Sequence, residues 1–146
     1  MSNKSTGTRF EKEFAAILAK HWFWVHLFQD NRNGQPCDVI AAKNGTAYLF
    51  DCKDCQEDVF LLSRIEENQY NAMQLFYMTG NSKGMFAIRF PEDGIYLIEY
   101  DKMKKMQDAG FKRINSCIGR TQGCRLEDWI RGKESEGEID ADHDWK

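Results

Sequence analysis

The chain has 146 residues, a mass of 17.1 kDa and a formal net charge of −3. This length indicates one domain, and hydrophobic and aromatic contents of 42% and 13% exclude an intrinsically disordered chain. The sequence contains no apolar run of the ~20 residues that a membrane helix needs, and no signal peptide. A cytoplasmic protein without membrane contact is therefore expected.

The first half of the chain predicts one helix followed by three strands. Thr8 and Glu11 match a capping box, in which two side chains bond to a helix N-terminus, so the first helix should begin near Thr8. Residues 22–28 are typical of a strand. Asn44-Gly45 is the strongest short signal for a two-residue hairpin turn, and it predicts a hairpin over residues 38–53.

The second half predicts a helix, two strands and a short helix. Ser63 and Glu66 match a second capping box, which predicts a helix from about Arg64 to Gly80, where glycine favours helix termination. Two more strands and the short helix are expected at residues 84–90, 95–100 and 101–109. The order α-β-β-β-α-β-β-α indicates an α/β fold in which helices flank a mixed central β-sheet.

The predicted hairpin brings two carboxylates together. With Asn44-Gly45 as the loop, paired residue numbers sum to 89, so Asp38 lies opposite Asp51 with Cβ atoms roughly 5 Å apart. Lys53 shares their face because strand side chains alternate. Opposed like charges destabilise a sheet unless something offsets them. Oxygen ligands at the rim of a core suit Mg²⁺ or Mn²⁺ rather than zinc. The alternative is a surface cluster in which Lys53 neutralises both acids.

These residues also carry a family resemblance. Pro36-Cys37-Asp38, a spacer of twelve residues and then Asp51-Cys52-Lys53 resemble the signature of PD-(D/E)xK nucleases. The run from Gly7 to Glu11 resembles the G-x-x-x-E element of Holliday junction resolvases. Residues 60–69 resemble the segment that leads to a helical glutamine in the RecU type of those enzymes. Together these elements span about residues 7–100.

The resemblance implies a restriction-endonuclease-like fold and a DNA endonuclease that depends on Mg²⁺ or Mn²⁺. It favours a resolvase of four-way junctions in DNA recombination and repair, with Glu11, Asp38 and Asp51 at the metal and Lys53 at the attacking water or the transition state. Paired cuts across a two-fold axis imply a homodimer. The alternatives are a restriction- or repair-type enzyme of the same superfamily, and a catalytically inactive nucleic-acid-binding module of the same fold.

Glu11 and Gln69 each have a purely structural alternative. Glu11 could serve the predicted capping box alone, or it could also act at the metal. Gln69 lies in the middle of the apolar stripe of the second helix, so its amide must find hydrogen-bond partners. We expect Gln69 to point at the hairpin, where it would orient Lys53, a water or a phosphate. Its alternative role is to cap a strand carbonyl inside the core.

The five cysteines predict reduced thiols, because an odd number without a secretion signal argues against a disulfide framework. Cys52 and Cys55 could be combined with Cys117 and Cys124 as a zinc site. Two features count against this site. Cys52 should face away from the carboxylates, and Cys117 and Cys124 are further apart than zinc ligands usually are.

The negative charge is concentrated at the C-terminus. Residues 133–146 contain six acids and two bases, so the rest of the chain is near +1. We therefore expect a nuclease domain at residues 1–132 and an acidic, disordered tail at 133–146 that aids solubility or mimics nucleic acid. Lys4, Arg9 and Arg32 flank the proposed site and are the predicted DNA-binding residues.

Overall fold

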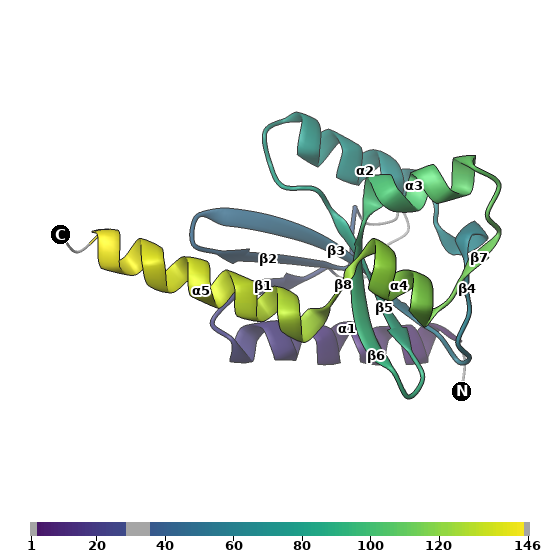
Figure 1. Cartoon of the computed structure of the whole chain (residues 1–146), viewed down its shortest axis with the longest axis horizontal. Coiled ribbons are helices and arrows are strands. Elements are labelled where there is room, and N and C mark those ends of the chain that lie inside the picture. The colour runs from purple at the N-terminus through teal and green to yellow at the C-terminus, as the bar shows by residue number, and fades with distance from the viewer. Residues whose placement is uncertain (1–2, 29–35, 145–146) are drawn as a thin grey trace.

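A six-stranded sheet lies between two layers of helices in the computed structural model of the chain (Figure 1). The structure describes residues 3–28 and 36–144, with side chains at 9–28 and 36–136. In this part of the chain no helix is long and apolar enough to cross a membrane. The elements are α1 (Asn3–Lys20), β1 (Trp24–Leu27), β2 (Val39–Lys43), β3 (Thr46–Asp54), β4 (Phe60–Leu61), a 3-10 helix (Leu62–Arg64), α2 (Glu67–Met78), β5 (Met85–Phe90), β6 (Gly94–Glu99), α3 (Tyr100–Asp108), β7 (Arg113–Ile114), α4 (Ser116–Gln122), β8 (Cys124–Arg125) and α5 (Leu126–Asp144).

The large sheet is mixed, as predicted. Its strand order is β1-β2-β3-β5-β6-β8, with β3 and β5 parallel and the other neighbours antiparallel. The parallel connection between β3 and β5 runs through α2. Strands β4 and β7 form a separate two-stranded sheet, which is drawn away from the main sheet in Figure 1.

Each face of the sheet has its own hydrophobic core, because side chains alternate along every strand. Helices α1 and α5 cover the first face, where Phe14 packs edge-on against Phe50, and Trp129 packs against Phe50 in the same way. Phe10, Phe14 and Leu18 recur every four residues along α1 and so face this core together. Helices α2, α3 and α4 cover the second face.

The β2–β3 hairpin has the predicted register up to its last residue. Asn44 and Gly45 adopt positive φ angles of 54° and 82°, as a tight two-residue hairpin turn requires, and pairing runs from Lys43–Thr46 to Val39–Phe50. At Asp38 the ladder shifts. Its backbone N–H donates to the Phe50 carbonyl at 3.0 Å instead of continuing opposite Asp51, as in a β-bulge. The prediction that Asp38 lies directly opposite Asp51 was therefore wrong by one residue.

Both predicted helix starts were also wrong. Helix α1 begins at Asn3, so Thr8 and Glu11 lie within it and do not cap its N-terminus. Helix α2 begins at Glu67, and the Gln69 side chain accepts a hydrogen bond from the Glu66 N–H at 3.1 Å. The capping interaction thus involves Glu66 and Gln69, three residues later than expected. The stop at Gly80 was correct, because Gly80 follows α2 and its cap with φ of 100°.

The acidic C-terminal segment begins inside α5. This helix runs from Leu126 to Asp144 and continues through the expected domain boundary at residue 132. Lys133 lies 5.6 Å from the centre of the Trp129 ring, and Glu134 contacts His21 Nδ1 at 2.7 Å. The first turn of the acidic segment therefore packs against the rest of the domain.

Candidate active site

The predicted catalytic residues meet at a pocket of about 520 Å³ beside the C-terminal end of β3. They come from α1, the residue before β2, β3 itself and the first turn of α2. The pocket is lined by Glu11, Asp38, Lys53 and Gln69. Asp51 is completely buried and adjoins the pocket through Lys53, whose Nζ lies 3.1 Å from Asp51 Oδ1.

Asp51 is an incompletely compensated buried carboxylate. Within the described part of the chain, neither of its oxygens accepts a hydrogen bond, and the Lys53 ammonium lies at ion-pair distance without hydrogen-bond geometry. The pKa of Asp51 is raised to about 7, because burial and the nearby charge of Asp38 raise it by more than Lys53 lowers it. A buried carboxylate without hydrogen bonds is costly, so this site has the chemistry that a bound cation would complete.

Asp38 is held in place by the backbone of the neighbouring strand. Its Oδ2 accepts a hydrogen bond of 2.7 Å from the Cys52 N–H, and the side chain is 7% exposed at the pocket. Glu11 reaches the same pocket from α1. Among the side chains that the structure describes, no three His, Cys, Asp or Glu residues already form a cluster able to hold a metal.

Gln69 joins the start of α2 to the lysine. Its Oε1 accepts hydrogen bonds from Lys53 Nζ at 3.5 Å and from the Glu66 N–H at 3.1 Å. The Gln69 side chain thus points toward Lys53, as expected. Gln69 caps its own helix, not a strand carbonyl in the core.

A partly buried group of ion pairs that lies next to the site was not predicted from the sequence. Arg89 donates from Nε and Nη2 to the two carboxylate oxygens of Asp54, both at 2.9 Å, and Nη1 contacts Glu13 on α1. The Arg89 guanidinium also lies 4.4 Å from the centre of the Phe10 ring. Arg89 on β5 thus connects the end of β3 to α1, where it contacts one residue before Glu11 and one after it. The available signal was a single charge within the apolar run Met85–Phe90.

The predicted DNA-binding residues are only partly described. Arg9 is exposed on α1, two residues before Glu11. Lys4 belongs to α1, but its side chain lies outside the described part, and Arg32 lies outside the described residues altogether. All three remain predictions.

The cysteines are free thiols, as expected. Cys52 belongs to the core under α1 and Cys55 to the core on the opposite face, so this pair cannot share a zinc ion. Burial is the main cause that raises the pKa of the Cys37 thiol to about 12, and the nearby charges of Asp38 and Asp51 contribute to the rise. The buried Cys37 thiol is therefore unreactive at neutral pH.

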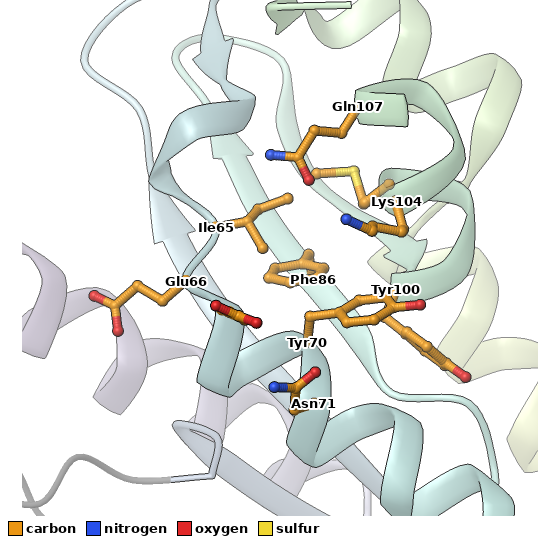
Figure 2. A pocket seen from close by; sticks show the side chains of 10 residues that line it. Ile65, Glu66, Tyr70, Asn71, Phe86, Tyr100, Lys104 and Gln107 are labelled. Carbon is orange, nitrogen blue, oxygen red and sulfur yellow. The ribbon is translucent and has the colours of Figure 1, made fainter. Parts of the chain in front are cut away.

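A second pocket, of about 370 Å³, lies between α2 and α3 (Figure 2). Tyr70 and Tyr100 face it, and the Lys104 ammonium lies 5.4 Å from the centre of the Tyr70 ring. None of the predicted catalytic residues lines this pocket. The pocket at the end of β3 is therefore the candidate active site.

Comparisons with known proteins show the family and the fold of the chain. Residues 2–138 match the archaeal Holliday junction resolvase (Hjc) family. The chain belongs to the Hjc family. The crystal structure of Archaeoglobus fulgidus Hjc, a Holliday junction resolvase from an archaeal hyperthermophile, superposes with a TM-score of 0.67 at 16% sequence identity. That match covers 85% of this chain and 99% of the Archaeoglobus chain, and it shows the same fold.

Other similarities are weaker. The crystal structure of AF1548, a protein of unknown function, superposes with a TM-score of 0.39 at 21% identity, covering 70% of this chain and 54% of that one. No curated protein sequence matches the chain significantly.

Membership of the Hjc family confirms the predicted class of enzyme. The protein is a nuclease of the PD-(D/E)xK superfamily with a restriction-endonuclease-like fold, and its function is that of a Holliday junction resolvase. Nucleases of this family depend on a divalent metal. The resemblance to RecU-type enzymes indicated the same class of nuclease, although the matching family is Hjc.

Proposed function

We propose that Asp38 and Asp51 hold the divalent metal for cleavage of four-way DNA junctions, and that this metal is Mg²⁺, with Mn²⁺ as a substitute. The observation that supports this most directly is the buried Asp51 carboxylate, which accepts no hydrogen bond within the described part of the chain. Carboxylate oxygens are the ligands that Mg²⁺ and Mn²⁺ prefer. Glu11, which lines the same pocket from α1, contributes directly or through water.

The surrounding side chains have distinct roles in this proposal. A divalent cation bound by the carboxylates would activate a water for attack and stabilise negative charge on the phosphate. Lys53 orients the attacking water or stabilises the transition state with its positive charge. Gln69 accepts a hydrogen bond from Lys53 Nζ and thereby restricts the position of the ammonium.

Cleavage of synthetic DNA by matched variants tests this assignment. Asp51→Asn and Asp38→Asn should each lower the rate on a four-way junction by at least about two orders of magnitude, the scale of losing one preorganised electrostatic group. Asp101→Asn is the control, because Asp101 pairs with Lys83 on the α3 side, away from the pocket. Duplex and single-stranded DNA of the same sequence measure junction preference. Wild-type rates in either hairpin variant would remove the hairpin carboxylates from the mechanism.

We also propose that the enzyme is a homodimer, because paired cuts across a four-way junction match a two-fold pair of sites. Among the aromatic residues that could form an interface, the buried Phe23 stacks on the partly buried Trp129 of the same chain, with ring centres 5.5 Å apart. Trp22 and Trp24 are 88% and 62% exposed. Trp24 lies on β1, an edge strand of the sheet, so we assign the interface to this edge.

Sedimentation of charge-insertion variants tests the interface. Wild type should sediment as a dimer of the 17.1 kDa chain at micromolar concentration. Trp24→Glu should yield monomers, whereas Leu75→Glu, on the exposed side of α2 at 64% exposure, should leave the dimer intact. A dimer that dissociates only with Leu75→Glu would place the interface on α2. A wild-type monomer would contradict the dimer and leave the assignment of the catalytic residues unaffected.

A further inference from the structure

A second surface adjoins the active-site pocket through Leu61. This residue lines both that pocket and a neighbouring hollow of about 360 Å³ at the β4–β7 sheet. We propose that this hollow, which we call the Phe111 surface, binds a DNA arm next to the cleaved phosphodiester. Phe111 would stack on a base exposed at the branch point, and Lys112 and Arg113 would contact phosphates. The inference rests on the proposed function and extends it. The Phe111 surface comprises Leu61, Ser63, Phe111, Lys112 and Arg113.

Phe111 is an exposed aromatic residue on a fixed backbone. Helix α3 ends in a Schellman motif, in which the Gly110 N–H donates to the Gln107 carbonyl at 3.1 Å and the Phe111 N–H to the Met106 carbonyl at 3.0 Å. In this motif the residue after the glycine commonly packs against the helix. Here 54% of Phe111 remains exposed, and its neighbour Leu61 is 45% exposed. The ring is thus available to a partner.

The strands beneath Phe111 keep the surface rigid. Leu61 pairs with Arg113 across the β4–β7 sheet, and the Leu62 N–H donates to the Lys112 carbonyl at 3.0 Å. Gln107 donates from Nε2 to the Leu62 carbonyl at 3.4 Å, and Figure 2 shows this amide extending from α3. A surface already held in place loses little conformational entropy when it binds.

The charge of this surface fits a polyanion. Lys112 and Arg113 are exposed, and within the described part of the chain neither forms an ion pair with an acid. By contrast, Arg89 and Arg125 are each paired with an aspartate. Arg64, on the wall of the active-site pocket, adds a third cation beside Leu61. Free cations next to an exposed aromatic ring are the combination that binds DNA backbone and stacks on unpaired bases.

The surface is also continuous with the place of cleavage. Because Leu61 belongs to both hollows, DNA whose scissile phosphate lies at Asp38 and Lys53 passes the Phe111 surface on leaving the pocket. A continuous duplex stacks its bases internally, whereas a branch point leaves base faces without a neighbour. Phe111 should therefore discriminate junctions from duplex, and the two cations should bind both.

The test measures affinity for a four-way junction and a matched duplex, with Ca²⁺ replacing Mg²⁺ to prevent cleavage, over a series of salt concentrations. The variants are Phe111→Ala, Phe111→Trp and the double variant Lys112→Gln with Arg113→Gln. The control double variant, Lys20→Gln with Arg131→Gln, removes the same charge from α1 and α5 on the opposite face of the sheet. Junction cleavage by wild type is measured in parallel.

Phe111→Ala should weaken junction binding by about tenfold, the scale of one base stacked on an aromatic ring, with a smaller effect on duplex. Phe111→Trp should bind as wild type does. The Lys112/Arg113 double variant should weaken both complexes and reduce the salt dependence of log K by roughly two phosphate contacts. The Lys20/Arg131 variant should retain the junction preference and cleavage rate of wild type.

Three outcomes would overturn the inference. Affinities of the Phe111 and Lys112/Arg113 variants equal to those of the control, in a wild type that cuts junctions, would overturn the Phe111 surface alone. An equal loss on junction and duplex for Phe111→Ala would overturn stacking at the branch point. A wild-type protein that cuts no junction with any divalent metal would overturn the proposed function and this inference together.

Discussion

Lys53 Nζ lies 3.1 Å from Oδ1 of Asp51, which is completely buried. This single ion pair does not offset the burial, since the pKa of Asp51 is still raised to about 7, with Asp38 adding to the rise. The metal-free protein therefore holds a carboxylate whose charged form is destabilised by folding. That relationship makes the site detectable by measurements of stability as well as by activity.

We predict that metal-free wild type loses stability relative to Asp51→Asn as the pH rises from about 4 to about 7. In the unfolded chain Asp51 loses its proton near its ordinary pKa of 3.8, whereas the folded protein keeps that proton until about 7. Over this interval the unfolded state binds fewer protons, so the free energy of unfolding falls as pH rises. Denaturant unfolding in EDTA across this pH range measures the difference between the two proteins.

Two comparisons make the pH prediction specific. Mg²⁺ should stabilise wild type above pH 7 and have little effect on Asp51→Asn. Wild type should gain stability relative to Asp101→Asn as the pH rises, which is the opposite trend. The reason is that burial, which raises the pKa of Asp101, is outweighed by the ion pair with Lys83, which lowers this pKa. The stability that Asp101 contributes is lost as the pH falls. Parallel stability curves for wild type and Asp51→Asn would contradict the assigned environment of Asp51.

We predict that Gln69→Ala lowers both stability and cleavage. Gln69 Oε1 accepts one hydrogen bond at the start of α2 and one from Lys53, so its loss affects the helix and the ammonium together. The helix contribution should be about 1 kcal/mol, the usual size for a capping group. Asn115→Ala is the matched control, because Asn115 caps α4 through a 3.1 Å bond to the Ile118 N–H, away from the site.

The two variants should differ in their rates of junction cleavage. Asn115→Ala should lose similar stability and keep the wild-type rate of single-turnover junction cleavage, whereas Gln69→Ala should be slower at a temperature where both are folded. Equal rates for the two variants would limit Gln69 to its capping role.

The parts of the site that were predictable depend on local chemistry. The Asn44-Gly45 turn fixed the hairpin register, and the two-residue period of a strand then placed Lys53 on the face of Asp51 and Cys52 on the other. The mixed sheet followed from the order of the elements. These features are set by residues that are close together in the sequence, so local patterns are enough to predict them.

The wrong or missing predictions concern features that depend on tertiary contacts. Two overlapping capping patterns, at Ser63–Glu66 and Glu66–Gln69, competed for the start of α2, and the pattern that also connects Gln69 to Lys53 is the one present. At the shifted residue, the Asp38 carboxylate accepts a hydrogen bond from the Cys52 N–H, a contact that strand periodicity does not predict. Strands β4 and β7 have two residues each, too few for a periodic signal, and depend on pairing across more than fifty residues.

We predict that Arg89→Met raises the Mg²⁺ concentration needed for half-maximal cleavage. Arg89 bonds Asp54, next to Lys53, and contacts Glu13 and Phe10 on either side of Glu11. Its loss should let α1 shift and move Glu11 away from the aspartates, so metal affinity falls and excess Mg²⁺ restores part of the rate. Cleavage measured over a Mg²⁺ titration detects this change.

Arg125→Met is the matched control for Arg89. Arg125 also pairs with an aspartate, Asp93, at 3.0 Å, and its guanidinium lies 5.0 Å from the centre of an aromatic ring, Tyr96. It lies on β8, at the far edge of the sheet from the hairpin. Its loss should lower thermal stability without changing the Mg²⁺ requirement. The same Mg²⁺ requirement in both variants would show that Arg89 only stabilises the fold.

The C-terminal segment can be divided by two truncations. Deleting residues 137–146 removes four acids and one base, a net charge of −3, and leaves Lys133 and Glu134 in place. Deleting residues 133–146 removes six acids and two bases, a net charge of −4, together with those contacts to His21, Tyr48 and Trp129. The shorter deletion therefore removes acidic charge while it keeps the contacts of Lys133 and Glu134.

Both truncated proteins should bind junction DNA more tightly than wild type at low salt, because the acidic segment repels a polyanion. The gain should shrink as salt rises, since screening reduces the field of the segment. Only the longer deletion should also lower the melting temperature, because it alone removes the contacts of Lys133 and Glu134. If the shorter deletion weakened binding or abolished cleavage, residues 137–146 would have a positive role in the complex, as part of the dimer or of the DNA contact.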